Sequence, residues 1–303
     1  MAKLARSIRR ARRRFLFLSL QGLVRVAGFA RARALGTLAG DVQWWLGFVA
    51  RRRMVREVAH ALGRPADDPQ AAAVLREAFR VNDAAVFEIL ALFDRPIDAP
   101  TWLARCEIEG LDRLHAALAG GRGAILLATH SGNAALLAVA LAHAGIGISV
   151  VYKHARMMSA DFLERGFSLY GIQGILANEG IKAYGRMLSA LKGGRVVFIM
   201  LDQGVKSPKD ALVLPFLGKR LPMTPGPAQL ARHARAPVLP ATTIAARPVW
   251  RFAIEPEIAR VAGATLEQDA EQLVRATESQ ILRFPHLWSW HQRRWRSFPV
   301  ADG

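Results

Sequence analysis

Short apolar runs alternate with helix-like runs between residues 124 and 254, and this alternation restricts the fold more than any other feature. Brief aliphatic runs bounded by glycine or turn residues are typical of buried strands. They occupy residues 124–128, 148–152, 174–176, 195–201 and 237–244, and we expect an edge strand at 250–254. Helical patterns lie between them at 134–144, 160–170 and 180–192. The pattern predicts an α/β fold in which helices flank a central, mostly parallel sheet.

A histidine lies where the first of these strands ends, in the small-residue turn Thr129-His-Ser-Gly-Asn133. Ligands of α/β sheets bind at the carboxyl ends of strands, beside helix N-termini. A histidine side chain accepts a proton near neutral pH, and Gly132 lets a substrate approach the backbone closely. His130 is therefore a candidate general base, with a capping or core histidine as the alternative.

The net charge of the chain restricts the classes of partner that it can bind. Its 303 residues include 42 lysines and arginines against 24 acidic residues, which gives a formal net charge of +18. Such an excess indicates an acidic partner: anionic lipid, nucleic acid or an acidic carrier protein. The single cysteine, Cys106, excludes an intrachain disulfide framework and a cysteine-based zinc site. The eight histidines are dispersed, so we expect no metal and no cofactor.

The basic residues concentrate at the N-terminus. Residues 1–14 carry seven positive charges and no negative one, and apolar residues follow at 15–24. A second apolar run, Trp44-Trp-Leu-Gly-Phe-Val-Ala50, precedes Arg51-Arg-Arg53. Arg25 interrupts the first run after ten residues, whereas a spanning helix needs about 20. We expect a basic, amphipathic segment in an anionic leaflet, with tilted spanning, a twin-arginine export signal and a nucleic-acid arm as alternatives.

The chain divides at the end of this segment. From about Arg53 to Asp98 apolar residues recur at helical spacing, and Pro65 and Pro69 interrupt the pattern. We see no internal repeat and no low-complexity linker. We therefore expect one body with a helical N-terminal hairpin: residues 1–53 form the membrane-associated segment and residues 54–303 form the α/β domain.

Four segments, in order, resemble one known family. They are residues 129–133, Ala190-Leu-Lys-Gly-Gly-Arg-Val-Val-Phe-Ile-Met-Leu-Asp-Gln203, residues 214–240 with Thr224-Pro-Gly-Pro227, and Trp288-Ser-Trp-His-Gln-Arg-Arg-Trp295. Together they resemble the late (lauroyl and myristoyl) acyltransferases of lipid A biosynthesis, a branch of the glycerolipid and lysophospholipid acyltransferase superfamily. The similarity covers most of the chain.

This resemblance implies transfer of a fatty acyl group from a thioester of acyl carrier protein or coenzyme A. The acceptor would be a hydroxyl of a membrane glycolipid, such as a lipid A (lipopolysaccharide) precursor. The site would lie at the cytoplasmic face of the bacterial inner membrane. His130 would take the proton of the attacking hydroxyl, and backbone amides at the start of the 134–144 helix could stabilise the oxyanion. A nucleic-acid partner is not implied.

One position departs from the family pattern. The family carries Glu or Asp five residues after the histidine to orient the imidazole, and here that position is Ala135. Three explanations stay open. A carboxylate from elsewhere, Asp202 or Glu179, or the polar neighbour Asn133 could act with His130. The chain could belong to a subfamily with altered chemistry, or it could have lost catalysis and act as a lipid-binding or accessory protein.

Further residues are candidates for catalysis or substrate binding, and some of them also have a purely structural interpretation. Asp202 ends a strand and is either the second catalytic residue or a turn former. Gly132, Asn133, Arg165, Gln203 and Thr224 are candidate substrate-binding residues. Arg165 could instead be a solvated surface residue, and Thr224 could serve a rigid turn. The turn around His130 is no nucleophile elbow of the G-x-S-x-G type, and no GxGxxG opens a helix.

Overall fold

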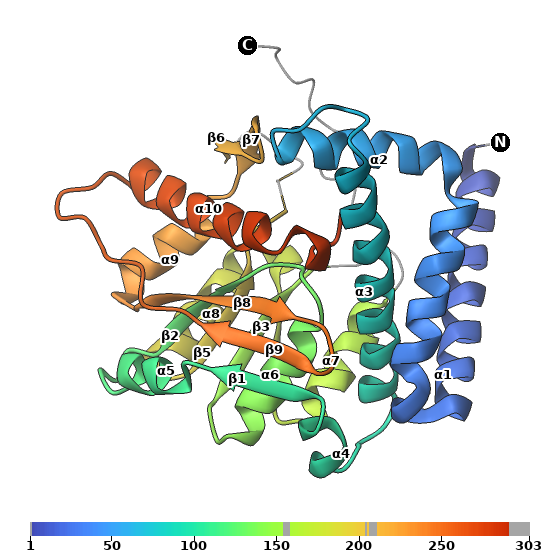
Figure 1. Ribbon diagram of the computed structural model, residues 1–303. Coiled ribbons are helices and arrows are strands. Elements are labelled where there is room, and N and C mark those ends of the chain that lie inside the picture. The colour runs from blue at the N-terminus through green and yellow to red at the C-terminus, as the bar shows by residue number, and fades with distance from the viewer. Residues whose placement is uncertain (1, 154–157, 204, 206–210, 291–303) are drawn as a thin grey trace.

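A seven-stranded sheet forms the centre of the protein, described here from a computed structural model that covers residues 2–153, 158–203, 205 and 211–290 (Figure 1). Every neighbouring pair of its strands is parallel except β8 and β9. The mostly parallel α/β sheet expected from the sequence is therefore confirmed. Its order is β1 (Cys106–Glu109), β9 (Trp250–Ile254), β8 (Val238–Ala245), β2 (Ala124–Ala128), β5 (Val196–Met200), β3 (Ile148–Tyr152) and β4 (Gln173–Leu176).

One strand occupies a different place from the one expected. We expected an edge strand at 250–254, but β9 is internal because β1 pairs with it in parallel and forms the edge. The sequence of β1, Cys-Glu-Ile-Glu, alternates half-buried and exposed residues and lacks the apolar run that marks the central strands. An antiparallel hairpin of β6 (Leu212–Phe216) and β7 (Lys219–Met223) also escaped the sequence analysis.

Helices cover both faces of the sheet. The alternation of β2 directs Leu126 toward α6 (Ala134–His143) and α7 (Ala160–Ser168), and directs Leu127 toward the opposite face. That opposite face carries α8 (Ile181–Lys192), α9 (Gly226–Ala234) and α10 (Leu266–Arg283). The short helix α5 (Leu111–Leu118) connects β1 to β2. The expected helices at 134–144, 160–170 and 180–192 are confirmed, whereas α10 has no counterpart in the sequence analysis.

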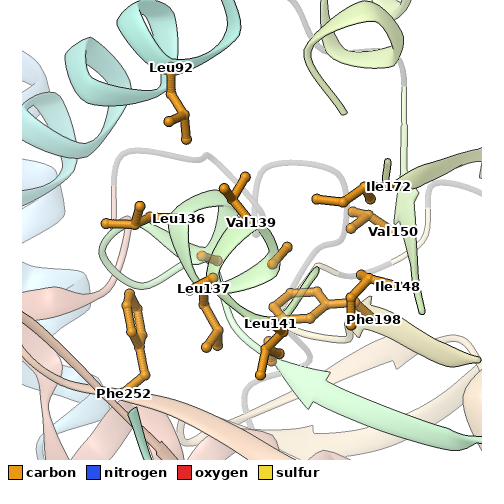
Figure 2. Close-up of a cluster of buried hydrophobic side chains, with 14 of the residues drawn as sticks. Leu92, Leu136, Leu137, Val139, Leu141, Ile148, Val150, Ile172, Phe198 and Phe252 are labelled. Atoms are coloured by element: carbon orange, nitrogen blue, oxygen red, sulfur yellow. The ribbon is translucent and has the colours of Figure 1, made fainter. Parts of the chain in front are cut away.

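The helix that follows the His130 turn is a core element. Figure 2 shows leucines and a valine of α6 pointing toward Leu92 of α3, Phe252 of β9 and Phe198 of β5. Every side chain from Leu136 to Leu141 is buried, which is typical of a helix enclosed on all sides. The start of α6, next to the candidate base, is thereby fixed against the sheet.

The N-terminal helices form a separate layer beside the sheet. Helix α1 (Ala2–Leu46) reverses at Gly28, whose φ of 74° and ψ of 170° are open essentially to glycine alone. Its two arms therefore lie antiparallel, as the N-terminal hairpin predicted from the sequence requires (Figure 1). Among the described residues, only the helical stretch Arg14–Leu46, which includes the reversal at Gly28, is long and apolar enough by length and composition to cross a membrane. Helices α2 (Phe48–Ala61), α3 (Pro69–Asp94) and α4 (Ala99–Leu103) follow.

Close packing fastens the second arm of α1 to α3. Ala32 is fully buried, and Gly36 and Gly40 follow it at four-residue spacing on the same helix face. A Cβ on Gly36 would lie 2.5 Å from the Cα of Ala84, and one on Gly40 would lie 2.7 Å from the Cα of Arg80. Small residues thus let the two helix backbones approach each other. The N-terminal hairpin is packed against the α/β domain through α3.

Candidate active site

Two neighbouring parallel strands bring His130 and Asp202 together. Ala128 of β2 pairs with Met200 of β5, and each candidate residue lies two positions beyond its strand. The imidazole Nδ1–H of His130 donates to Oδ1 of Asp202 over 2.7 Å. The backbone N–H of His130 donates to the other carboxylate oxygen over 3.0 Å. The carboxylate therefore fixes both the tautomer and the orientation of the ring.

The carboxylate of Asp202 is itself held by a tryptophan. Asp202 is fully buried, and the indole Nε1–H of Trp288 donates to its Oδ2 over 2.6 Å. A buried carboxylate needs such donors, because removing a charge from water is costly. Trp288 is also buried, so its ring keeps water from the acid. From the sequence, Trp288 of the terminal motif is expected to pack or to lie at a lipid interface, and the residue type alone carries no signal for a contact with the acid.

The other ring nitrogen of His130 faces an amide. The side-chain Nε2 of Gln203 lies 3.1 Å from the Nε2 of His130. With its proton on Nδ1, the imidazole accepts this bond through the lone pair that a general base uses. The side chain of His130 is 28% exposed, so a substrate hydroxyl can reach it. Gln203 thus marks the position that the reacting hydroxyl would occupy.

A C-terminal segment closes over the histidine turn. The short helix η3 (Pro285–Leu287) leads into residues that pair with the turn: Ser289 N–H donates to the His130 carbonyl, and Gly132 N–H donates to the Leu287 carbonyl. From α3, the amide of Asn82 donates to the Trp288 carbonyl over 3.1 Å. Trp288 is thereby placed beside Asp202. The rest of the terminal motif, residues 291–295, lies outside the described residues.

Two predicted substrate-binding residues lie in the framework of the site. Asn133 is fully buried; its side-chain oxygen accepts from Leu136 N–H at the start of α6, and its NH₂ donates to Glu88 over 3.0 Å. Gly132 has a φ of 56°, and a Cβ there would lie 2.7 Å from the ring of Trp250. Glycine is therefore required at this position for close packing against the core.

A buried carboxylate behind the turn connects four elements. Glu88 of α3 is fully buried and accepts hydrogen bonds from Asn133, from the indole of Trp250 and from Arg33 of α1. The Arg33 guanidinium lies 2.8 Å from Glu88 and stacks 4.9 Å from the Trp250 ring centre. Glu88 is not among the residues predicted from the sequence. Its signal is an acidic residue inside the apolar run Val86-Phe-Glu-Ile-Leu90.

Within the described residues, the remaining candidates form no hydrogen bond or ion pair with His130. Arg165 is exposed on α7, and Thr224 uses its hydroxyl to accept from Gly226 N–H in the turn before α9. Glu179, of the two alternative carboxylates, pairs with Arg186 and not with the histidine. Ala135 is half-buried in the first turn of α6. The position where the family carries its acid therefore has no acidic group, and the carboxylate of Asp202 contacts the imidazole instead.

The single cysteine is poorly suited to nucleophilic chemistry. Burial, with the neighbouring Glu107 charge, raises the pKa of the Cys106 thiol to about 12. Since the thiolate is the nucleophilic form, Cys106 is inert near neutral pH. Covalent catalysis through this residue is therefore disfavoured, whereas the His130 imidazole is partly exposed and is oriented by Asp202.

An imidazole oriented by a buried carboxylate, at the carboxyl ends of parallel strands, is characteristic of α/β enzymes that activate a hydroxyl group. The chain belongs to the bacterial lipid A biosynthesis acyltransferases, whose family model matches residues 1–297. It is also 27% identical over 199 residues to a phosphatidylinositol mannoside acyltransferase from Mycobacterium tuberculosis. That alignment covers 62% of this chain and 59% of the relative. The resemblance found in the sequence is therefore confirmed at the level of the family.

Proposed function

We propose that this enzyme moves a fatty acyl group from a thioester of acyl carrier protein or coenzyme A to a sugar hydroxyl of a glycolipid, with His130 as general base. The contact between His130 and Asp202 carries the proposal. It leaves Nε2 to accept the hydroxyl proton as the oxygen attacks the thioester carbonyl. When the C–S bond breaks, the imidazolium returns that proton to the departing thiolate. The products are an ester and a free thiol.

Gln203 is proposed to take part in this sequence of events. Its amide must leave the His130 lone pair before a hydroxyl can bind there. The same NH₂ group is then within reach of the carbonyl oxygen of the thioester, where it would stabilise the developing negative charge. Asp202 would stabilise the imidazolium that forms during attack.

Glycolipid acceptors are supported by the printed names of the family and of the mycobacterial relative. Lipid A and phosphatidylinositol mannosides are both membrane lipids that offer sugar hydroxyls. We propose a location at the cytoplasmic face of the inner membrane, where thioester donors are available. The apolar N-terminal hairpin supports membrane association, because exposed Phe15, Leu16 and Leu18 on its first arm have no cover within the described residues.

A transfer assay tests the chemistry. Purified protein is given radiolabelled acyl carrier protein or coenzyme A thioesters and a panel of glycolipid acceptors. We expect His130→Ala and Asp202→Asn to lower turnover by about 10²–10⁴-fold, because each removes part of the general-base pair. Unchanged circular dichroism and melting temperature serve as the folding control. Undiminished turnover in His130→Ala would contradict the proposal.

The accessory-protein hypothesis is tested by the same assay with Ala135→Glu. Because Asp202 already orients the ring, we expect the natural sequence to be active and the added glutamate to give no gain. A natural protein that forms no product with any donor or acceptor, while Ala135→Glu does, would instead identify a scaffold that has lost its acid. The buried, fully bonded Asp202 favours the enzyme.

A further inference from the structure

A basic groove lies where the second arm of α1 meets α2, on the N-terminal layer. It has a volume of about 610 Å³, within the range of small-ligand sites. Its walls combine two tryptophans, three arginines and small apolar residues. The lining includes Trp44, Trp45, Arg51, Arg52, Val55 and Arg56. Neither His130 nor Asp202 lines it, so it is separate from the candidate active site.

One arginine of the groove is held rigidly in place. The guanidinium of Arg51 donates to the Trp44 carbonyl over 2.9 Å and lies 4.8 Å from the centre of the Trp44 ring. It also lies 5.1 Å from the centre of the Phe48 ring. The ring contacts involve the face of the guanidinium, and the bond to the Trp44 carbonyl uses one nitrogen, so other N–H donors of Arg51 stay available. A fixed guanidinium of this kind suits a phosphate group, which it can bind through two parallel hydrogen bonds.

Among the described residues that line the groove, three arginines face a single acid. Arg52 and Arg56 are exposed, and within the described chain no carboxylate lies within ion-pair distance of Arg51, Arg52 or Arg56. Their neighbour Arg53, by contrast, pairs with Glu57. Asp67 is the one acid among the groove residues. An uncompensated cluster of this kind calls for an anionic ligand.

Apolar side chains beside the groove indicate which class of anionic ligand it binds. Trp45 is 66% exposed, Leu46 81% and Val42 47%, all on the last turns of α1. Water-exposed leucine and tryptophan next to arginines are typical of a surface that rests at the headgroup level of a bilayer. A soluble phosphate would gain nothing from these side chains, whereas a lipid would bury them against its acyl chains.

We propose that this groove binds the phosphate of an anionic phospholipid headgroup, with Arg51, Arg52 and Arg56 on the phosphate and Trp45 and Leu46 among the acyl chains. The inference rests on the membrane association proposed above and is independent of the acyl-transfer chemistry. The site would fix the depth and orientation of the N-terminal layer, and thereby the distance of His130 from the bilayer.

The test compares two charge-matched double variants in vesicle co-sedimentation. Arg52→Gln with Arg56→Gln removes two exposed charges from the groove. Arg122→Gln with Lys192→Gln removes two exposed charges where Gly123 packs on Leu191, at the amino ends of β2 and β5 and far from α2 (Figure 1). The vesicles are phosphatidylcholine with or without phosphatidylglycerol, at physiological salt. Soluble short-chain phosphatidylglycerol and inorganic phosphate are titrated separately.

We expect the groove variant to lose about 30-fold in partitioning to phosphatidylglycerol vesicles, because two arginines near the leaflet act together. Partitioning of the control variant should change by less than about 3-fold, since charges at the amino ends of β2 and β5 would lie farther from the leaflet than a Debye length of about 8 Å. Short-chain phosphatidylglycerol should bind the wild type and not the groove variant.

Equal losses in both variants would overturn the inference, because they would reveal diffuse charge attraction only. Inorganic phosphate that binds as tightly as the short-chain lipid would also overturn the inference. So would a groove variant that no longer binds acyl carrier protein but still binds the vesicles. Transfer to a water-soluble acceptor, measured in parallel, should be unchanged in the groove variant. This parallel measurement distinguishes a loss of acyl transfer from a loss of lipid binding in the groove.

Discussion

At the scale of single residues, the acid of the site comes from a neighbouring strand. Ala135 has no group that could orient the imidazole, yet Asp202 contacts both the ring and the backbone of His130. The carboxylate in turn depends on the indole of Trp288. The geometry therefore supplies a complete pair of base and orienting acid without the residue that the family pattern leads one to expect.

Trp288→Phe should lower kcat by about 10–100-fold, because a hydrogen bond to a charged group is worth about 1.5–3 kcal/mol. Phenylalanine keeps most of the buried ring and removes the N–H donor to Asp202. Trp290→Phe is the matched control, since the Trp290 indole donates to the Pro285 carbonyl instead. Steady-state kinetics with a saturating thioester measure the effect. Equal losses of kcat in the two variants would contradict a positioning role for Trp288.

At the scale of elements, small residues decide where the N-terminal hairpin lies. Gly28 permits the reversal of α1, and Gly36 and Gly40 allow its second arm to approach α3. The buried pair of Arg33 and Glu88 then connects these two helices beside Asn133. Contacts of α1 thus extend to the residue that caps the helix behind His130.

Gly36→Ala should destabilise the protein by about 1–3 kcal/mol, because the new methyl group would lie 2.4 Å from the Asp83 carbonyl oxygen and force the helices apart. Gly22→Ala on the first arm meets nothing within 4 Å. This control should gain up to about 1 kcal/mol from helix propensity. Urea unfolding measures both changes. A Gly36→Ala protein as stable as Gly22→Ala would show that the two helices are not packed this closely.

At the scale of the whole molecule, the half-buried Asp83 of α3 couples stability to pH. Burial raises the pKa of Asp83 on α3 to about 7, against about 3.9 in an unfolded chain. Between these two values the folded protein binds a proton that the unfolded chain lacks. The contribution of Asp83 to stability is therefore greatest below about pH 4 and falls as pH rises to about 7, above which it is constant.

Asp83→Asn should remove this dependence, because an amide does not titrate. We expect the wild type to lose up to about 4 kcal/mol of unfolding free energy between pH 4 and pH 7 through this group, and the variant to gain stability relative to the wild type at about pH 8. Urea unfolding across this pH range gives both curves. Parallel curves for the two proteins would show that Asp83 is ionised in the fold.

The sequence by itself determined the elements with strong local patterns. The strands at 124–128 and 148–152 have the bounds expected, and the helix after His130 ends within one residue of the expected position, because apolar periodicity is a property of neighbouring residues. The reversal within residues 1–53 was likewise expected. The division of function between that segment and residues 54–303 stays a prediction.

Tertiary structure alone decided which residues meet. Asp202 was a candidate beside Glu179, and only the parallel register of Ala128 with Met200 places Asp202, not Glu179, against His130. Glu88 joins Asn133 and Trp250 through contacts between residues far apart in the chain, and β1 takes the sheet edge by pairing with β9. Strand order and buried polar networks depend on these long-range pairings, and no local pattern in the sequence records them.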